Sequence, residues 1–177
     1  MCRATVIMGV CGTGKSTVGQ VLAERLDCPF LEGDSFHPPE NVAKMRTGTP
    51  LDDDDRWPWL DLIGQQITIE CQCHDQVIVA CSALKRAYRD RLRNFAGDDT
   101  LFVLLHGGLD LLQQRLQERT HDYMPPSLLL SQLEALELPE ADETALSLDV
   151  KASLSDLVQA IEAELLIRPG TPKSSCV

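Results

Sequence analysis

The sequence predicts an α/β fold in which a five-stranded parallel sheet carries helices on both faces. Five short apolar runs have the length and composition of buried strands: Ala4–Met8, Phe30–Glu32, Gln76–Ala80, Leu101–His106 and Ala145–Val150. Longer segments with apolar residues at helical spacing lie between them. Strands that alternate with helices are typical of parallel sheets that are covered on both faces. Ligands of such sheets bind beyond the carboxyl ends of the strands, so we expect the chemistry there.

Apolar residues at spacings of three and four predict the helices. The predicted helices are Lys15–Leu26, a helix with Pro58 in its first turn that continues to Cys71, Leu84–Leu92, a helix marked by Leu109 to Leu116, Ser127–Leu136 and Ser153–Leu166. Ser153 and Asp156 resemble a capping box at the start of the last helix. His37–Asp55 is rich in Pro, Gly and Asp, which indicates loops and a short helix.

Size and composition indicate one globular domain. A chain of 177 residues can fill one core but not two ordinary domains, so we expect a single domain over residues 1–167 and a frayed tail over 168–177. The formal net charge of -11 argues against nucleic acid and anionic membranes as partners, because both would repel an acidic surface. A small anionic substrate is not excluded, but it needs a local nest of Lys, Arg and backbone N–H groups.

The seven cysteines are interpreted as free thiols. Their number is odd, and several lie in segments that are predicted to be buried. The first residues run into a strand-like segment without the pattern of a signal peptide, so we expect a cytoplasmic protein. The apolar runs are much shorter than a membrane span, which predicts no transmembrane helix.

The turn after the first predicted strand has the pattern GxxxxGKS, which is typical of phosphate-binding loops. It reads Gly9-Val10-Cys11-Gly12-Thr13-Gly14-Lys15-Ser16, and Thr17 follows in the helix. Glycines let the backbone wrap around a phosphate with its N–H groups inward, and the positive end of the helix dipole points at the same anion. We predict that residues 9–17 bind ATP, with Lys15 at the β- and γ-phosphates and the Ser16 hydroxyl on Mg²⁺. A chance match is disfavoured, because a strand precedes the turn and a helix follows it.

Acidic residues follow the second predicted strand, in the run Glu32-Gly33-Asp34-Ser35-Phe36-His37. Asp34 is expected to face the γ-phosphate, where a carboxylate can orient an acceptor hydroxyl and take its proton. Glu32 is expected to hold a water molecule on Mg²⁺. For His37 two interpretations stay open, acceptor binding and a backbone hydrogen bond within a loop.

Two further segments supply cations for an anionic acceptor. Arg56 follows four aspartates, Asp52–Asp55, which we interpret mainly as the solvated start of a helix. Its fork of donors suits a carboxylate. After the third strand, Lys85, Arg86 and Arg89 belong to a group of four cations within seven residues. In an acidic chain this group favours an anion site over a solvated helix face.

Arg115 and Arg119 lie four residues apart on one predicted helix face, just before the breaker segment Thr120–Pro126. Cations at the base of a mobile flap can close over phosphates and stabilise the charge in transfer. We predict that Arg115 binds the nucleotide and that Arg119 is catalytic. The alternative is a pair of surface arginines.

Four blocks of sequence together resemble the gluconokinases, relatives of shikimate kinase and adenylate kinase. They are MGVCGTGKST, EGDSFHPPENVAKMRTGTPLDDDDRWPWL, CSALKRAYRDRLR and SQLEALELPEADE, within a similarity that extends from about Val6 to about Val150. The resemblance implies a three-layer P-loop kinase fold with a five-stranded parallel sheet, an acceptor-binding region at about residues 35–72 and a lid at about residues 119–127. It also implies transfer of phosphate from ATP to the 6-hydroxyl of D-gluconate, with Mg²⁺, by a homodimer.

The same resemblance assigns roles to individual residues. Asp34 corresponds to the acceptor-binding acid of the family, Lys15 and Ser16 to its phosphate and Mg²⁺ groups, and Arg119 to its lid arginine. Gln132, in the last block, is expected to contact the acceptor. Two other functions stay open: a kinase of another small hydroxy acid, such as shikimate or a different aldonate, and a nucleotide-sensing module without turnover.

Overall fold

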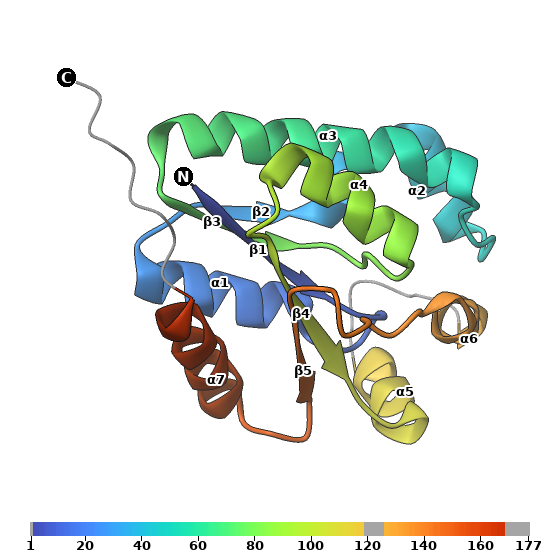
Figure 1. The fold of residues 1–177 in the computed structure, drawn as a ribbon. Helices are drawn as coiled ribbons and strands as arrows, with labels where there is room; N and C mark the ends of the chain where they lie inside the picture. The colour runs from blue at the N-terminus through green and yellow to red at the C-terminus, as the bar shows by residue number, and fades with distance from the viewer. Residues whose placement is uncertain (1, 119–125, 169–177) are drawn as a thin grey trace.

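One parallel sheet forms the centre of the molecule (Figure 1). The computed structural model describes residues 2–118 and 126–168, and within these ranges the sheet has five strands in the order β2-β3-β1-β4-β5. All neighbouring pairs are parallel. The strands are β1 (Arg3–Met8), β2 (Phe30–Glu32), β3 (Gln76–Ala80), β4 (Leu101–His106) and β5 (Ala145–Asp149). The prediction of an α/β fold around a five-stranded parallel sheet is therefore confirmed.

Helices cover both faces of this sheet (Figure 1). They are α1 (Lys15–Leu26), the short 3₁₀ helix η1 (Gly33–Phe36), α2 (Pro39–Arg46), α3 (Asp53–Cys73), α4 (Arg86–Ala96), α5 (Leu109–Gln117), α6 (Pro126–Ala135) and α7 (Leu154–Ile167). On one face, α3 and α4 bury side chains such as Trp59 and Leu92 against the strands. On the other face, α1 and α7 bury side chains such as Leu22 and Ile161. The result is the three-layer arrangement that was predicted.

Strand β1 lies between the two cores and at the centre of the topology. Val6 points into the core under α3 and α4, whereas Ile7 points into the core under α1 and α7. Burial on both faces explains why the strands appear in the sequence as continuous apolar runs. Strands β3 and β4 lie on opposite sides of β1. The crevice beyond its carboxyl end is where sheets of this kind bind ligands.

Helix α3 begins earlier than the sequence pattern predicted. We expected Pro58 in the first turn, but Asp52 is the N-cap and Pro58 lies inside the helix. Asp52 and Asp55 form a capping box in which each side chain accepts the other residue's backbone N–H, at 2.9 and 3.0 Å. The acidic run does start a helix, as we expected. Asp53 and Arg56 consequently lie in the first turn of α3.

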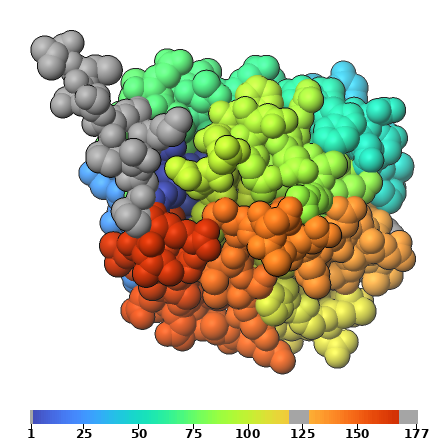
Figure 2. All heavy atoms as spheres, viewed as in Figure 1, coloured from blue at the N-terminus to red at the C-terminus, as the bar shows by residue number. Residues whose placement is uncertain are grey.

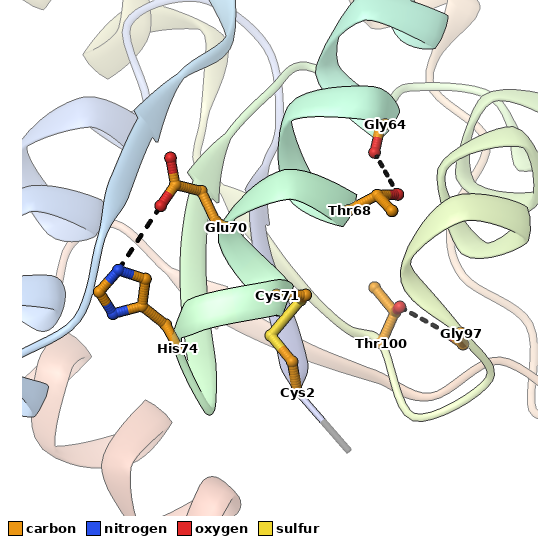
Figure 3. Close-up of a disulfide and its surroundings, with 8 residues drawn as sticks. All are labelled: Cys2, Gly64, Thr68, Glu70, Cys71, His74, Gly97 and Thr100. Atoms are coloured by element: carbon orange, nitrogen blue, oxygen red, sulfur yellow. Dashed lines mark hydrogen bonds and ion pairs between the residues drawn. A yellow bond between two sulfur atoms is a disulfide. The ribbon is translucent and has the colours of Figure 1, made fainter. Parts of the chain in front are cut away.

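The expectation of free thiols is wrong for two of the cysteines. Cys2, just before β1, and Cys71, near the end of α3, form a disulfide (Figure 3). Their Cα atoms are 5.2 Å apart although 69 positions separate them in the sequence. Among the other cysteines, Cys28, Cys73 and Cys81 are thiols. The number of cysteines in the sequence cannot indicate this pair, because only the folded structure brings Cys2 and Cys71 together.

Two expectations from the sequence fall mostly outside the described residues. Most of the lid expected at about 119–127 and most of the tail expected at 168–177 lie in the ranges 119–125 and 169–177. Within residues 2–118 and 126–168, no helix combines the length and the hydropathy that a membrane crossing requires.

Candidate active site

The glycine-rich turn between β1 and α1 has a backbone that suits glycine. Gly9, Gly12 and Gly14 have φ angles of 135°, 82° and 87°. At Gly9 a Cβ atom would lie 2.4 Å from the carbonyl oxygen of Leu105, so no side chain fits there. Gly14 caps α1 without any side-chain hydrogen bond. The amino end of α1 therefore presents backbone N–H groups and a positive dipole to an anion.

A cavity of about 390 Å³ opens beside this turn. Its lining includes Gly12, Thr13, Gly14, Thr17 and Arg115. The Arg115 guanidinium donates to the carbonyl oxygen of Val150 at 2.9 Å, which holds it at this position. Nucleotide-binding residues predicted from the loop and from α5 thus lie at one cavity.

Polar side chains contact the same turn from two directions. Lys15 Nζ donates to the carbonyl oxygen of Val10 at 3.0 Å. The backbone N–H of Cys11 donates to Gln132 Oε1 at 2.7 Å. Gln132 belongs to α6, and its neighbour Ser131 lines a second cavity on the acceptor side. Gln132, which we expected to contact the acceptor, therefore contacts the phosphate-binding turn, and its contact with the acceptor stays a prediction.

The turn after β2 brings Asp34 and His37 together. Gly33 lets it approach β3 closely, since a Cβ atom at Gly33 would lie 2.3 Å from the Ala80 carbonyl oxygen. Trp59 Nε1 donates to the Gly33 carbonyl at 2.8 Å, and the Trp59 ring stacks on His37 with centroids 4.2 Å apart. His37 Nε2 lies 3.9 Å from Asp34 Oδ1. The side chain of His37 is 4% exposed and that of Asp34 is 74% exposed.

The His37 ring is neutral at neutral pH. Burial lowers the pKa of His37 to about 4; the Arg56 charge acts in the same direction and the Asp34 charge opposes it. Asn41 Nδ2 lies 3.4 Å from His37 Nδ1 and also donates to the Asp55 carbonyl at 2.8 Å. An amide nitrogen can only donate, so Nδ1 accepts and the ring proton sits on Nε2, facing Asp34.

A second cavity, of about 530 Å³, lies between the amino end of α3, the start of α4 and α6. It is lined by Pro50, Leu51, Asp52, Asp53, Asp54, Arg56, Lys85, Tyr88, Ser131 and Ala135. Two residues predicted for the acceptor, Arg56 and Lys85, therefore share one cavity. Lys85 Nζ lies 2.6 Å from Asp53 Oδ1, and the Tyr88 hydroxyl donates to the same oxygen.

The charges of the two sides meet near the end of β3. Burial raises the pKa of the Cys81 thiol to about 12. The Asp34 charge acts in the same direction, whereas the Lys15 and Arg56 charges oppose it. The three charges that act on this buried thiol come from the phosphate-loop lysine, the predicted acid and the predicted carboxylate-binding arginine. This arrangement suits transfer between an anionic donor and an anionic acceptor.

Comparison with known proteins identifies the family. A sequence model described as shikimate kinase matches residues 11–162. A probable gluconokinase of Xenopus tropicalis is 44% identical over 174 residues, which are 90% of this chain and 92% of the relative. The gluconokinase of Gluconobacter oxydans is 44% identical over 168 residues, 92% of this chain and 93% of the relative. The crystal structure of a gluconokinase from Sinorhizobium meliloti shares 47% identity with a TM-score of 0.84, over 93% of this chain and 92% of that one. This chain belongs to the gluconokinase family.

In this gluconokinase-family chain, the prediction that Arg89 binds substrate is wrong. Its side chain is fully buried and forms a two-pronged ion pair with Glu143, at 2.6 and 2.7 Å. Its remaining nitrogen donates to the carbonyl oxygens of Leu84 and Glu137, at 3.2 and 3.0 Å, and more weakly to that of Ala83. Every nitrogen of the guanidinium is engaged within the fold, so none is left for a ligand.

Arg86 also points away from the acceptor cavity. Its guanidinium donates to Glu140 at 2.6 Å and to Asp142 at 2.7 and 2.9 Å, on the segment before β5. Figure 2 shows α4 and this segment side by side on the surface. The structure thus assigns Arg86 to surface ion pairs, and the predicted contact between Arg86 and substrate is not supported by its placement.

For the other predicted residues, the contacts with ligands stay predictions. Ser16 lies in the first turn of α1, next to the phosphate-binding turn. Glu32 is the last residue of β2, opposite Ala80 in the sheet. Arg119 lies outside the described residues, so its catalytic role is neither supported nor opposed.

Sequence reasoning missed two members of this gluconokinase-family site, Asp53 and Tyr88. We had attributed the four aspartates mainly to the solvated start of a helix, and we had not interpreted Tyr88. The available signal was spacing, because Tyr88 follows Lys85 by three residues and so lies near it where α4 begins. Only the packing of α3 on α4 brings Asp53 to both.

Proposed function

We propose that this chain transfers the γ-phosphate of ATP to the 6-hydroxyl of D-gluconate and gives 6-phospho-D-gluconate and ADP. The observation that supports it best is the presence of two cavities, one lined by the phosphate-binding turn and Arg115 and the other lined by Arg56 and Lys85. One cavity has the features of a phosphate site and the other offers cations and hydrogen-bonding groups to a sugar acid. The identity to gluconokinases over nine tenths of the chain points to the same acceptor.

On the donor side, backbone N–H groups and Lys15 would hold the triphosphate. Lys15 Nζ would leave the Val10 carbonyl for the β- and γ-phosphates. Mg²⁺ would bind through Ser16, with Glu32 holding one of its water molecules; both side chains offer the oxygen donors that this ion prefers. When bound, the ion neutralises charge on the phosphates. Arg115 would contact the nucleotide from the other side of the cavity.

On the acceptor side, Asp34 would accept the proton of the 6-hydroxyl as that oxygen attacks the γ-phosphorus. The bond from the γ-phosphorus to the bridging oxygen breaks, and ADP leaves with that electron pair. Asp34 is exposed and can reach an acceptor, while His37 Nε2–H faces it from a fixed ring. Arg56 would bind the carboxylate of gluconate, since it lines the acceptor cavity and offers a fork of donors.

The further expectations concern assembly and location. We propose a homodimer in the cytoplasm that contacts neither nucleic acid nor membrane. Exposed apolar side chains on α3, at Leu62 and Ile69, offer one surface for such an interface. Light scattering on the purified protein measures the mass directly. The disulfide between Cys2 and Cys71 would be held reduced in a reducing compartment, so its state in cells bears on the location.

A panel of acceptors tests the proposed function. Purified protein with Mg²⁺ and ATP is assayed for ADP release with D-gluconate, a second aldonate, shikimate or no acceptor, and the product is assigned by ³¹P NMR. We expect release with gluconate only, and a loss of about 100-fold or more in kcat for Asp34→Asn. Shikimate turnover without gluconate turnover would support the other kinase, and ATP binding without acceptor-dependent release would support the sensing module. Either result would contradict the proposal.

A further inference from the structure

Four side chains from α3 and α4 interlock in the acceptor cavity. They are Asp53 and Arg56 from the first turn of α3, Lys85 from the N-cap of α4 and Tyr88 from its first turn. Lys85 and Tyr88 both donate to Oδ1 of Asp53. The ammonium of Lys85 and the guanidinium of Arg56 lie 5.5 and 5.6 Å from the centroid of the Tyr88 ring. The aromatic ring therefore holds the two cations in place beside Asp53.

The two cations differ in whether a carboxylate of the protein neutralises their charge. Lys85 is neutralised by Asp53 at 2.6 Å. Arg56 has no ion pair with any residue in 2–118 or 126–168, and its Nε makes only a long contact of 3.4 Å with the Leu51 carbonyl. A carboxylate entering the cavity would therefore find an unneutralised partner in Arg56 rather than in Lys85.

Asp53 keeps acceptor capacity for a ligand. Lys85 and Tyr88 occupy Oδ1, whereas Oδ2 has no hydrogen bond to a described residue, and the side chain is 48% exposed. Hydrogen bonds from Lys85 and Tyr88 lower the pKa of Asp53, so the carboxylate stays ionised at neutral pH. An ionised carboxylate only accepts hydrogen bonds, and hydroxyl groups are the donors that a sugar acid offers.

We propose that Asp53 is a specificity-determining residue that accepts hydrogen bonds from the chain hydroxyls of the acceptor, while Arg56 binds the acceptor's carboxylate. Lys85 and Tyr88 are positioning residues for Asp53, which changes the role predicted for Lys85 from the sequence. The inference rests on the proposed function and states which two features of gluconate the site selects. These features are the chain hydroxyls and the carboxylate; acids without the intervening hydroxyls and polyols without the carboxylate bind weakly.

The test separates the two contacts with three acceptors. D-Gluconate carries both features, 6-hydroxyhexanoate lacks the intervening hydroxyls, and D-sorbitol lacks the carboxylate. Each is measured as a substrate or, where turnover is too slow, as a competitive inhibitor against gluconate. For Asp53→Asn we expect the preference for gluconate over 6-hydroxyhexanoate to fall at least tenfold, mainly through KM, with KM for ATP unchanged. For Arg56→Gln we expect the preference for gluconate over sorbitol to fall by a similar factor.

Asp61→Asn is the matched control. Asp61 also joins α3 to α4, through a two-pronged pair with Arg91 at 2.6 and 2.7 Å, but neither residue lines the acceptor cavity. Its preferences should equal those of the wild type. Tyr88→Phe is the second variant if Asp53→Asn does not fold; it removes only the hydroxyl that holds Asp53, and it should shift the same preference in the same direction.

The outcomes distinguish this inference from the proposed function. A wild-type protein that does not phosphorylate gluconate contradicts both. A wild type that does, with unchanged preferences in Asp53→Asn and Tyr88→Phe, contradicts only the role of Asp53. If Lys85→Met, rather than Arg56→Gln, removes the preference over sorbitol, Lys85 binds the carboxylate and the division of roles is overturned.

Discussion

At the scale of single residues, the candidate site combines an exposed carboxylate with a buried neutral ring. Asp34 is open to solvent and to an acceptor, whereas His37 is held between Trp59 and Asn41. The neutral ring faces Asp34 with Nε2 at 3.9 Å from Oδ1 and adds no positive charge beside it. Burial of His37 therefore places a neutral ring, not a cation, beside the predicted acid.

The buried histidine predicts a loss of stability in acid. An unfolded histidine titrates near 6.5, but the folded pKa of His37 is about 4. Between these values the unfolded chain binds a proton that the native state does not, so the stabilisation is complete above pH 6.5 and falls as the pH decreases towards 4. We expect His37→Phe, which keeps an aromatic ring on Trp59, to reduce the difference in unfolding free energy between pH 7 and pH 4.5. The reduction should be about 1–3 kcal/mol.

Urea denaturation at the two pH values gives this difference. His106→Gln, a change at an exposed histidine on the end of β4, is the control and should behave as the wild type does. Equal pH dependence in His37→Phe and the wild type would show that the ring does not resist protonation in the folded state.

Prediction from the sequence worked best for residues whose role is set by neighbours in the chain. The phosphate-binding turn is such a case, because its glycines, Lys15 and the start of α1 are contiguous. Arg86 and Arg89 are the opposite case. Their carboxylate partners lie about fifty positions further on, between Glu137 and Glu143, and a local cluster of cations gives no sign of them. Asp53 was missed for the same reason.

At the scale of elements, Arg89 connects three parts of the structure. It joins α4 to the segment before β5 through Glu143, and it bonds the Ala83 and Leu84 carbonyls in the turn after β3. Ala83 has a φ of 42°, a left-handed conformation that is unfavourable for alanine. The buried ion pair therefore supports the turn that carries Lys85 into the acceptor cavity.

Arg89 and Arg86 predict opposite effects on stability. Arg89→Met leaves the buried Glu143 without its main partner, and we expect the free energy of unfolding to fall by about 3–5 kcal/mol. Arg86→Met removes only exposed ion pairs and should change it by less than about 1 kcal/mol. Both values come from urea denaturation. Similar losses in the two variants would contradict the assignment of Arg89 to the fold and of Arg86 to the surface.

At the scale of the whole molecule, the disulfide and the candidate site lie at opposite ends of the strands. Cys2 precedes the first residue of β1, whereas the phosphate-binding turn follows the last one. Cys71 likewise lies near the carboxyl end of α3, about four to five turns from Arg56 and Asp53 at its start. A change at the disulfide should therefore alter stability without altering the acceptor cavity.

The Cys2–Cys71 bond closes a loop of 69 positions, which strongly reduces the number of conformations open to the unfolded chain. For a loop of this size, loss of the bond is expected to lower the free energy of unfolding by about 4 kcal/mol. In a chain of this length that corresponds to a decrease in Tm of roughly 10 °C. We expect this decrease in Cys71→Ser, and in the wild type after reduction, with KM for gluconate and for ATP unchanged.

Cys73→Ser, at an exposed thiol two positions further along, is the control and should keep the wild-type Tm. If reduction, verified by mass spectrometry, leaves the Tm unchanged, the bond does not restrict the unfolded chain in this way. A change in either KM would show that the disulfide and the candidate site are coupled through the sheet.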